Sequence, residues 1–373
     1  MNYINIEKNR IYGLDILRFF AIFFVIFGHA SAVLPKPYAE IHEKIFPFDG
    51  VTIFFVLSGF LIGGILIKII NRTNYNAKDL TNFWVRRWMR TLPAYYFTLF
   101  LLIIPRLFLD PNFYINSEWR HYFFLQNLYM QHVDFFSESW SLTIEEWFYL
   151  TFPALLFIFF KLLKNKKKII LYAIFSFLLI SILIRYTIYI DNKPMDINMW
   201  DAFLRRSVVT RLDSLMFGVL GAYFAYYYKD LWLKHKKTLL YISIISFVSI
   251  SLSTPKIPNF YSSVIYFTFI SISVLFSLPF LSTFKSGSGK VYKIVTITSI
   301  ISYSLYLLNY SFIREFLIFD IIHNKIYTHL HLSLLTTTII DYFSYWILLF
   351  ILSFLMYKYI EQPMMKLRDK ITH

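Results

Sequence analysis

The chain of 373 residues contains no cysteine, and only 16% of its residues are charged. The first absence excludes disulfide bonds, thiolate metal sites and a cysteinyl acyl-enzyme, although it does not reveal the redox compartment. The second sets the chain apart from ordinary soluble domains, of which about 25% of the residues are charged. Together with a content of 57% hydrophobic residues, this composition is typical of an integral membrane protein.

Long apolar runs recur from one end of the chain to the other. Ten of them approach the ~20 residues needed to cross the hydrocarbon of a bilayer, at 14–33, 51–70, 92–109, 147–163, 169–190, 207–228, 238–254, 260–282, 296–318 and 335–357. This pattern predicts an all-α fold, a polytopic membrane bundle of about ten transmembrane helices. Because no internal repeat, low-complexity linker or appended soluble domain is visible, we expect a single domain over residues 1–373.

The formal net charge of +15 is distributed unevenly along the chain. The segments on one side of the ten-span topology hold most of the basic residues, among them Lys8, Arg10, Lys68, Arg72, the run 161–168 and the C-terminal segment 357–370. Basic loops remain in the cytoplasm, so we expect a multi-pass protein of the inner or plasma membrane with both termini cytoplasmic. This distribution explains the charge without a nucleic-acid partner.

Two ionisable residues, Arg18 and His29, lie within the first apolar run. They are separated by about three helical turns, so both project from nearly the same face, ~16 Å apart along the axis. A charged group costs roughly 2.5–3.5 kcal/mol at the centre of a spanning helix, so this face should look into the bundle or a wet cavity. His29 can exchange a proton near neutral pH, whereas Asp15 is expected to pair with Arg18.

The same segment also fits a cleavable signal peptide. Lys8 and Arg10 precede the apolar run 19–27, and the small residues 30–32 follow it. Cleavage there would start the mature chain at Val33 and remove the histidine.

A basic cluster follows the second apolar run, in the stretch FWVRRWMRTLPAYY. Arg87 and Arg90 are three residues apart and therefore share a helical face, with Arg86 beside them. Guanidinium groups bind phosphates in a two-pronged way. The alternative is ordinary topogenic charge that contacts anionic lipid.

Two adjacent carboxylates, Glu145 and Glu146, stand at the start of the fourth apolar run, in WSLTIEEWFYL. The predicted topology places them at the outer end of that span. One of them can cap the helix N-terminus, while the other can orient a histidine or an acceptor hydroxyl.

These pieces occur in an order that resembles the acyltransferase-3 family, the multi-spanning membrane O-acyltransferases that modify sugars and other hydroxylated acceptors. The motifs that carry the resemblance are Arg18 and His29 in LDILRFFAIFFVIFGH, Ser58 and Gly59 in DGVTIFFVLSGFLIG, Arg87 and Arg90 in RRWMRTLP, Ser141 and Glu145 in WSLTIEEWFY, and the later segments TRLDSLMFGVLGAY, SYSLYLLN and YKYIEQPMMK. One departure is Asn309, where family members commonly carry histidine.

The resemblance implies an acyl-coenzyme A donor, usually acetyl-CoA, from the cytoplasm and a hydroxyl acceptor on a cell-surface polysaccharide or glycoside, with no metal. We further expect an intramembrane tunnel that lets the donor reach His29, which would be the general base, with Glu145 orienting either the histidine or the sugar. Arg86, Arg87 and Arg90 would bind the donor phosphates, and the remaining catalytic candidates are Asp15, Arg18 and Ser141.

Several alternatives stay open. Transfer can be direct, or it can pass through an acyl-histidine or acyl-serine intermediate. Arg211 and Asp213 are expected to form a structural pair. A secondary transporter or a polymer-export component is the competing functional class, because intramembrane Asp, Arg and His also build proton relays. The sequence does not identify the acceptor or the oligomeric state.

Overall fold

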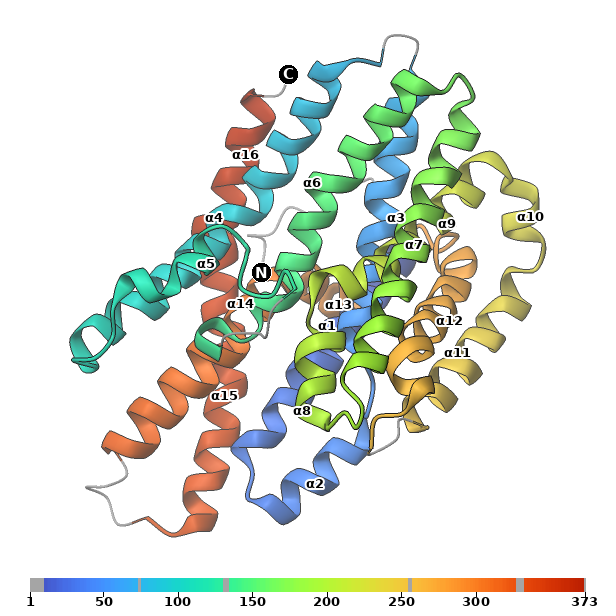
Figure 1. Ribbon diagram of the computed structural model, residues 1–373. Coiled ribbons are helices and arrows are strands. Elements are labelled where there is room, and N and C mark those ends of the chain that lie inside the picture. The colour runs from blue at the N-terminus through green and yellow to red at the C-terminus, as the bar shows by residue number, and fades with distance from the viewer. Residues whose placement is uncertain (1–9, 73–74, 130–133, 254–256, 327–331, 372–373) are drawn as a thin grey trace.

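The computed structural model describes residues 10–72, 75–129, 134–253, 257–326 and 332–371 (Figure 1), so Lys8 lies outside the described residues. Within these ranges the elements are helices, and no strand occurs. The α-helices are α1 (Tyr12–Ala30), α2 (Lys36–Ile45), α3 (Gly50–Ile70), α4 (Ala77–Leu109), α5 (Trp119–Tyr122), α6 (Ser139–Leu162), α7 (Lys166–Asp191), α8 (Ile197–Met199), α9 (Val208–Tyr227), α10 (Lys229–Lys234), α11 (Lys236–Leu252), α12 (Tyr266–Leu281), α13 (Gly289–Ile300), α14 (Ser302–Leu308), α15 (Leu334–Met356) and α16 (Gln362–Ile371).

Short helices of other types connect or extend these elements. The 3₁₀ helices are η1 (Ser31–Val33), η2 (Ile115–Glu118) and η3 (Asp134–Phe136), and the π-helical segments are η4 (Trp200–Arg205), η5 (Tyr261–Ile265), η6 (Asn309–Ile326) and η8 (Tyr357–Glu361).

The fold is an all-α membrane bundle, as the sequence predicts. In the described part of the chain, eight helices are long and apolar enough to cross a bilayer, or nine if the pair α13 and α14–η6, bent by 55°, counts as one broken span. The remaining predicted span, 238–254, corresponds to α11, which has 17 residues. A helix of that length reaches about 25 Å, slightly less than the ~30 Å thickness of the hydrocarbon.

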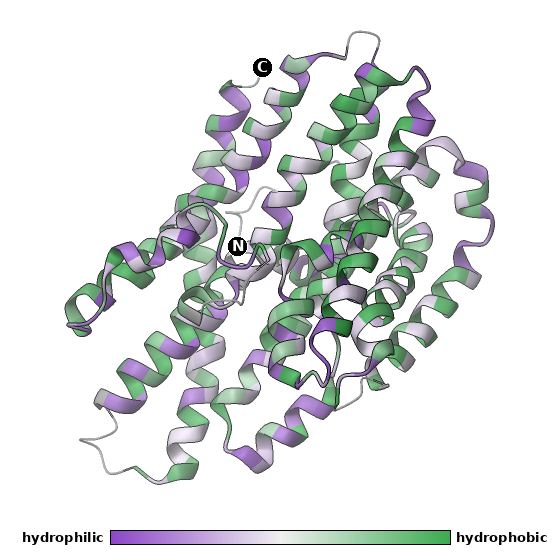
Figure 2. Ribbon diagram, in the orientation of Figure 1, coloured by the Kyte–Doolittle hydropathy of each residue, from purple (hydrophilic) through white to green (hydrophobic). Residues whose placement is uncertain are grey.

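Apolar residues lie both inside the bundle and on its outer surface. The largest buried cluster draws on α1, α3, α4, α6, α7, α9, α14 and α15. Helices at the periphery expose large apolar side chains, for example Leu179, Ile245 and Ile347. Figure 2, coloured by hydropathy, shows that most residues along α3, α7 and α12 are apolar, whereas α16 is more hydrophilic. An outer surface of this kind suits lipid, not water.

Several basic segments share one end of the bundle. The ammonium of Lys166 donates a hydrogen bond of 3.0 Å to the backbone carbonyl of Arg72, and Arg86 lies 3.5 Å from Asp369 of α16. The connections α3–α4 and α6–α7 therefore lie near the C-terminal helix, at the top of Figure 1. This agrees with the topology predicted for these segments.

Glycines allow α3 and α9 to cross in close contact. A Cβ atom on Gly59 would lie 1.9 Å from the carbonyl oxygen of Leu215, and one on Gly218 would lie 2.0 Å from that of Val56. Small residues at a helix crossing let two backbones approach directly, which is a common way to pack membrane helices. The crossing fixes Ser58, the neighbour of Gly59, relative to the rest of the bundle.

Two helices begin earlier than the apolar runs predict. Helix α4 starts at Ala77 and not at 92, and α6 starts at Ser139 and not at 147. The added turns are rich in Arg, Trp, Ser and Glu, which lower the hydropathy but are compatible with a helix. The start of α4 is fixed by a capping box in which the side chains and backbone amides of Asn76 and Asp79 exchange hydrogen bonds.

Candidate active site

A cavity of about 540 Å³ lies between α1, α3, α4, α6, α9 and α14. Its polar lining comprises Arg18, Ser58, Lys68, Arg87, Arg90, Thr91, Ser141, Glu145, Tyr149, Tyr226, Ser302, Tyr303 and Tyr306. Four of these side chains are basic and one is a carboxylate. The excess of positive charge makes the cavity suitable for an anionic ligand. Five of the residues predicted for the site, Arg18, Arg87, Arg90, Ser141 and Glu145, are thus brought together here.

Glu145 lies inside the bundle and not at its outer end. Because α6 starts at Ser139, this glutamate is almost two turns into the helix. Its carboxylate accepts hydrogen bonds from the hydroxyls of Ser58, at 2.7 Å, and Tyr149, at 3.1 Å. It also interacts electrostatically with Arg18 and Arg90. The expectation that Glu145 lies at the outer end of its span is therefore wrong, and this carboxylate instead lines the same cavity as Arg18 and Arg90.

The neighbouring Glu146 has a different position. Its side chain is buried and accepts a hydrogen bond of 2.7 Å from the hydroxyl of Thr91 on α4. The N-cap residue of α6 is Glu138. Neither carboxylate of the pair therefore caps the helix, and Glu146 instead ties α6 to α4.

The three arginines of the basic cluster are separated by the structure. Arg87 and Arg90 line the cavity, whereas Arg86 faces Asp369. The Nε atom of Arg87 is buried and has no hydrogen-bond partner among the described residues. A buried donor without a partner is rare in a protein interior, so this one is available to a ligand.

Arg18 lines the cavity without the expected partner. Asp15 pairs instead with the guanidinium of Arg10 and accepts a hydrogen bond of 2.7 Å from Ser299 of α13. The predicted pair of Asp15 with Arg18 is therefore wrong. Asp15 fixes the first turn of α1 and is not among the residues that line the cavity.

Ser141 contributes to the cavity wall through a buried hydrogen bond. Its hydroxyl donates to the hydroxyl of Tyr306 at 2.6 Å, and Tyr306 in turn donates to the backbone carbonyl of Glu138 at 3.1 Å. The two bonds fix Tyr306, which lines the cavity on α14.

His29 lies just beyond this wall. Its Nδ1 atom forms a hydrogen bond with Oδ1 of Asn309, and its ring packs edge-on against Tyr310, with 4.9 Å between the ring centroids. The histidine therefore faces another helix of the bundle and not lipid. It does not belong to the cavity lining, but Asn309 donates from Nδ2 to the backbone carbonyl of Tyr306 at 2.6 Å. The structure thus connects His29 to the cavity through Asn309 and Tyr306, and not through Glu145.

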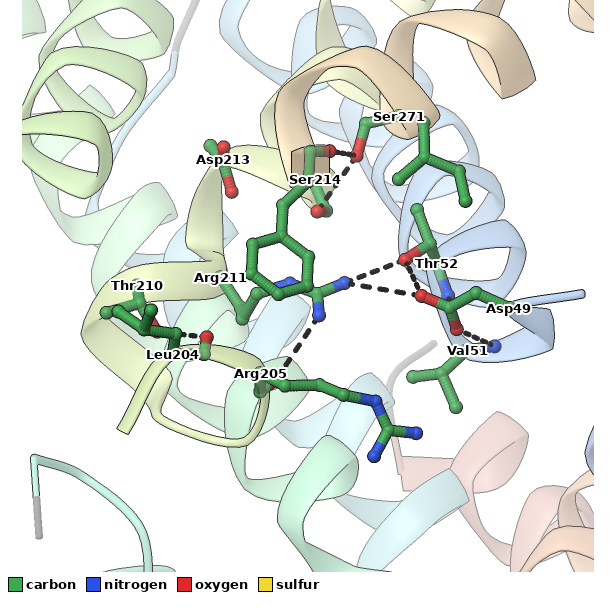
Figure 3. Close-up of polar contacts among 12 residues, drawn as sticks. Asp49, Val51, Thr52, Leu204, Arg205, Thr210, Arg211, Asp213, Ser214 and Ser271 are labelled. Carbon is green, nitrogen blue, oxygen red and sulfur yellow. Dashed lines mark hydrogen bonds and ion pairs between the residues drawn. The ribbon is translucent and has the colours of Figure 1, made fainter. Parts of the chain in front are cut away.

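Arg211 and Asp213 both lie in a buried polar network, although they do not pair with each other (Figure 3). Arg211 donates to the hydroxyl of Thr52 at 2.7 Å and lies 3.9 Å from Asp49, while Asp213 pairs with Arg185 at 2.7 Å. Asp49 also caps α3 by accepting from two backbone amides. The network fixes the start of α3, where Val51 lines the cavity. Neither Arg211 nor Asp213 lines the cavity, and the predicted pairing of the two is wrong because each has another partner.

Some lining residues were not recognised from the sequence. Lys68 counts in the sequence only as topogenic charge. Thr91, Tyr149, Tyr303 and Tyr306 all stand within the quoted segments RRWMRTLP, WSLTIEEWFY and SYSLYLLN, but none of them is singled out there. The repeated aromatic hydroxyls near charged motifs are the signal that could have identified the group. Among the described residues, His, Asp and Glu side chains form no group that could hold a metal ion.

Comparison with known proteins finds a matching family model and several relatives of this chain. A family model described as "Acyltransferase domain" matches residues 11–364. The peptidoglycan O-acetyltransferase OatA of Listeria monocytogenes is 32% identical over 180 residues, which cover 43% of this chain and 26% of that protein. The O-acetyltransferase OatA of Staphylococcus aureus is 32% identical over 227 residues, covering 57% and 34%.

A third relative, the putative peptidoglycan O-acetyltransferase YrhL of Bacillus subtilis, is 33% identical over 176 residues, covering 42% of this chain and 25% of its own. The matched region thus spans about a third or less of each of these relatives. No solved structure matches the chain.

Proposed function

This chain belongs to the acyltransferase-domain family, and on that premise we propose that it is a membrane O-acetyltransferase. It would move an acetyl group from acetyl-coenzyme A, supplied at the cytoplasmic side, to a hydroxyl group of a cell-surface carbohydrate. The names of its relatives make peptidoglycan the first acceptor to test.

The observation that carries the proposal is the basic cavity. Coenzyme A bears a diphosphate and a further phosphate, and Arg18, Arg87 and Arg90 present guanidinium groups within one cavity. Such groups form strong, two-pronged hydrogen bonds with phosphate oxygens. The partnerless Nε of Arg87 would gain an acceptor, and Lys68 would add a further cation at an exposed position.

The same residues support a cytoplasmic entry for the donor. Lys68 is near the end of α3, at the end of the bundle where the basic connections and α16 lie. The positive-inside rule assigns that end to the cytoplasm. The donor would therefore enter from the cytoplasm, and the C-terminus would lie there too.

We assign general-base catalysis of the acetyl transfer to His29. The pantetheine arm of the donor would extend from the cavity past Tyr306, so that the thioester carbon reaches the histidine. The imidazole would take the proton from the acceptor hydroxyl as its oxygen attacks that carbon. The new C–O bond forms, the C–S bond breaks, and the thiol of coenzyme A leaves with a proton.

The proposal is tested with the full chain purified in detergent and given radiolabelled acetyl-CoA with or without muropeptides. An acetyltransferase should bind the donor, hydrolyse it slowly and transfer label to the muropeptide hydroxyls. His29→Ala should abolish transfer and leave donor binding intact. A protein that neither binds nor turns over acetyl-CoA would contradict the proposal and would favour a transporter or an export component.

A further inference from the structure

The side chain of Asn309 is fixed by two hydrogen bonds of opposite sense. Its Nδ2 atom donates to the backbone carbonyl of Tyr306 at 2.6 Å, and its Oδ1 atom faces Nδ1 of His29. A carbonyl oxygen can only accept, so the first bond determines which end of the amide points toward the histidine. A flipped amide would place two oxygens against each other. The side chain is fully buried, so water does not compete for these bonds.

This orientation determines the tautomer of His29. Oδ1 of an amide has no hydrogen to donate, so the hydrogen bond requires a hydrogen on Nδ1 of the imidazole. In a neutral ring, the other nitrogen, Nε2, then carries the lone pair. A general base needs that lone pair on the nitrogen that meets the acceptor hydroxyl.

We propose that Asn309 is a positioning residue that holds His29 in the Nδ1–H tautomer and so presents Nε2 as the base. This inference rests on the proposed function for its catalytic meaning, but the tautomer itself is independent of it. Asn309 takes the place of an orienting carboxylate, and because it is neutral it fixes the ring without adding a negative charge.

The surroundings of the ring make a neutral partner suitable. Tyr310 packs against the imidazole, and Arg314 lies over the ring of Tyr310, with its Cζ atom 3.5 Å from the centroid. Arg205 and Arg206 also interact electrostatically with His29, and both pair with Asp201, at 2.7 and 2.6 Å. Arg314 pairs with Glu315. Each of these guanidiniums thus has a carboxylate partner, although Asp201 serves two of them, and an amide orients the ring without competing for these ion pairs.

The direct test is ¹⁵N NMR of the full chain labelled at histidine nitrogens, with the His29 signals identified by their loss in His29→Gln. The wild type should show a protonated Nδ1 and an unprotonated Nε2. Asn309→Asp keeps the acceptor oxygen and should keep this tautomer, whereas Asn309→Leu should shift His29 toward the Nε2–H form. A wild-type ring protonated at Nε2, or an unchanged tautomer in Asn309→Leu, would overturn the proposal, whether or not the protein acetylates anything.

Kinetics give the second readout. Asn309→Leu should lower the kcat of acetyl transfer on the order of 100-fold, the scale of general-base catalysis, while the KM for acetyl-CoA changes less than about twofold, because Asn309 does not line the cavity. Asn309→Asp should retain more activity than Asn309→Leu.

A matched control is Asn192→Leu, since Asn192 also donates to a carbonyl of its own helix, at 2.8 Å, but at the end of α7. It should keep wild-type kcat. Equal loss of activity in both Leu variants, or an altered KM in Asn309→Leu alone, would refute the positioning role, whereas an inactive wild type with the expected tautomer would refute only the proposed function.

Discussion

The hydroxyl of Ser58 on α3 donates a hydrogen bond of 2.7 Å to the carboxylate of Glu145 on α6, and both residues line the same cavity. The bond joins two helices whose positions are set elsewhere, α3 by its glycine crossing with α9 and α6 by the contact of Glu146 with Thr91. Glu145 is therefore held in one orientation among the arginines. A carboxylate fixed in this way can balance part of their charge while the cavity is empty of phosphate.

Loss of the bond between Ser58 and Glu145 should lower the free energy of unfolding. Ser58→Ala removes a donor to a charged acceptor and should cost about 1.5–3 kcal/mol. Glu145→Gln weakens the same bond, so the double variant should be less destabilised than the sum of the two single variants, with an interaction energy of roughly 0.5–3 kcal/mol.

Thermal unfolding in detergent, followed by tryptophan fluorescence, measures this cycle. The control is Ser176→Ala, because Ser176 donates only within its own helix, to Tyr172 at 2.7 Å. Strict additivity of the Ser58 and Glu145 variants would show that the bond contributes nothing.

The structure separates the three clustered arginines into two functional groups. Replacing Arg87 and Arg90 with Ala removes two cavity guanidiniums and should raise the Kd for acetyl-CoA at least about tenfold, since one hydrogen bond to a charged group contributes about 1.5–3 kcal/mol. Arg86→Ala should change that Kd less than about twofold, because Arg86 faces Asp369. Isothermal titration at low and high salt measures the Kd for acetyl-CoA of the double variant and of Arg86→Ala. An equal increase in Kd for the two proteins would mean that the cluster acts only as general surface charge.

The crossing of α3 and α9 leaves no room for a methyl group. Gly59→Ala should destabilise the protein by about 1–3 kcal/mol, the usual cost of overpacking, because the new Cβ would meet the carbonyl of Leu215 at 1.9 Å. Gly64 lies on the same helix with nothing within 4 Å of its Cβ position. Gly64→Ala should keep or raise the melting temperature, since alanine favours a helix. A similar melting temperature for the two variants would mean that the helices separate without cost.

The sequence predicts individual helices well where a run is continuously apolar. The run 51–70 and the helix Gly50–Ile70 agree to within one residue at both ends, because Asp49 and Asn71 bound the run. The starts of α4 and α6 are missed because their first turns are polar. The first turns of α6 are buried in the bundle, whereas Ala77 and Lys78 at the start of α4 are exposed. Hydropathy reports contact with lipid, and it does not distinguish a polar turn in water from one that lines a cavity.

The motifs predict which residues belong to the site, but not how they are arranged. Arg18, Arg87, Arg90, Ser141 and Glu145 do line one cavity. The placement of Glu145 at the outer end of its span is wrong, because α6 starts eight residues before the apolar run and puts this glutamate inside the helix. The bond between His29 and Asn309 joins residues 280 positions apart, and no local spacing rule specifies such a pair.

The buried ion pair of Arg185 and Asp213 should be more important for stability than any exposed pair. Both side chains are fully buried, at a distance of 2.7 Å, and Arg211 adds a second buried guanidinium nearby (Figure 3). Asp213→Asn would leave Arg185 without a compensating charge and should cost about 3–5 kcal/mol, whereas Arg211 keeps Asp49 at 3.9 Å. The control is Arg72→Ala, which breaks the pair with Asp79 at a side chain that is 64% exposed and should cost about 0–1 kcal/mol. Both variants can be compared by thermal unfolding in detergent, with acetyl-CoA binding as the check that the cavity has formed. If Asp213→Asn unfolds no earlier than Arg72→Ala, water or lipid headgroups must reach Arg185, and the buried pair would contribute no more to stability than an exposed one.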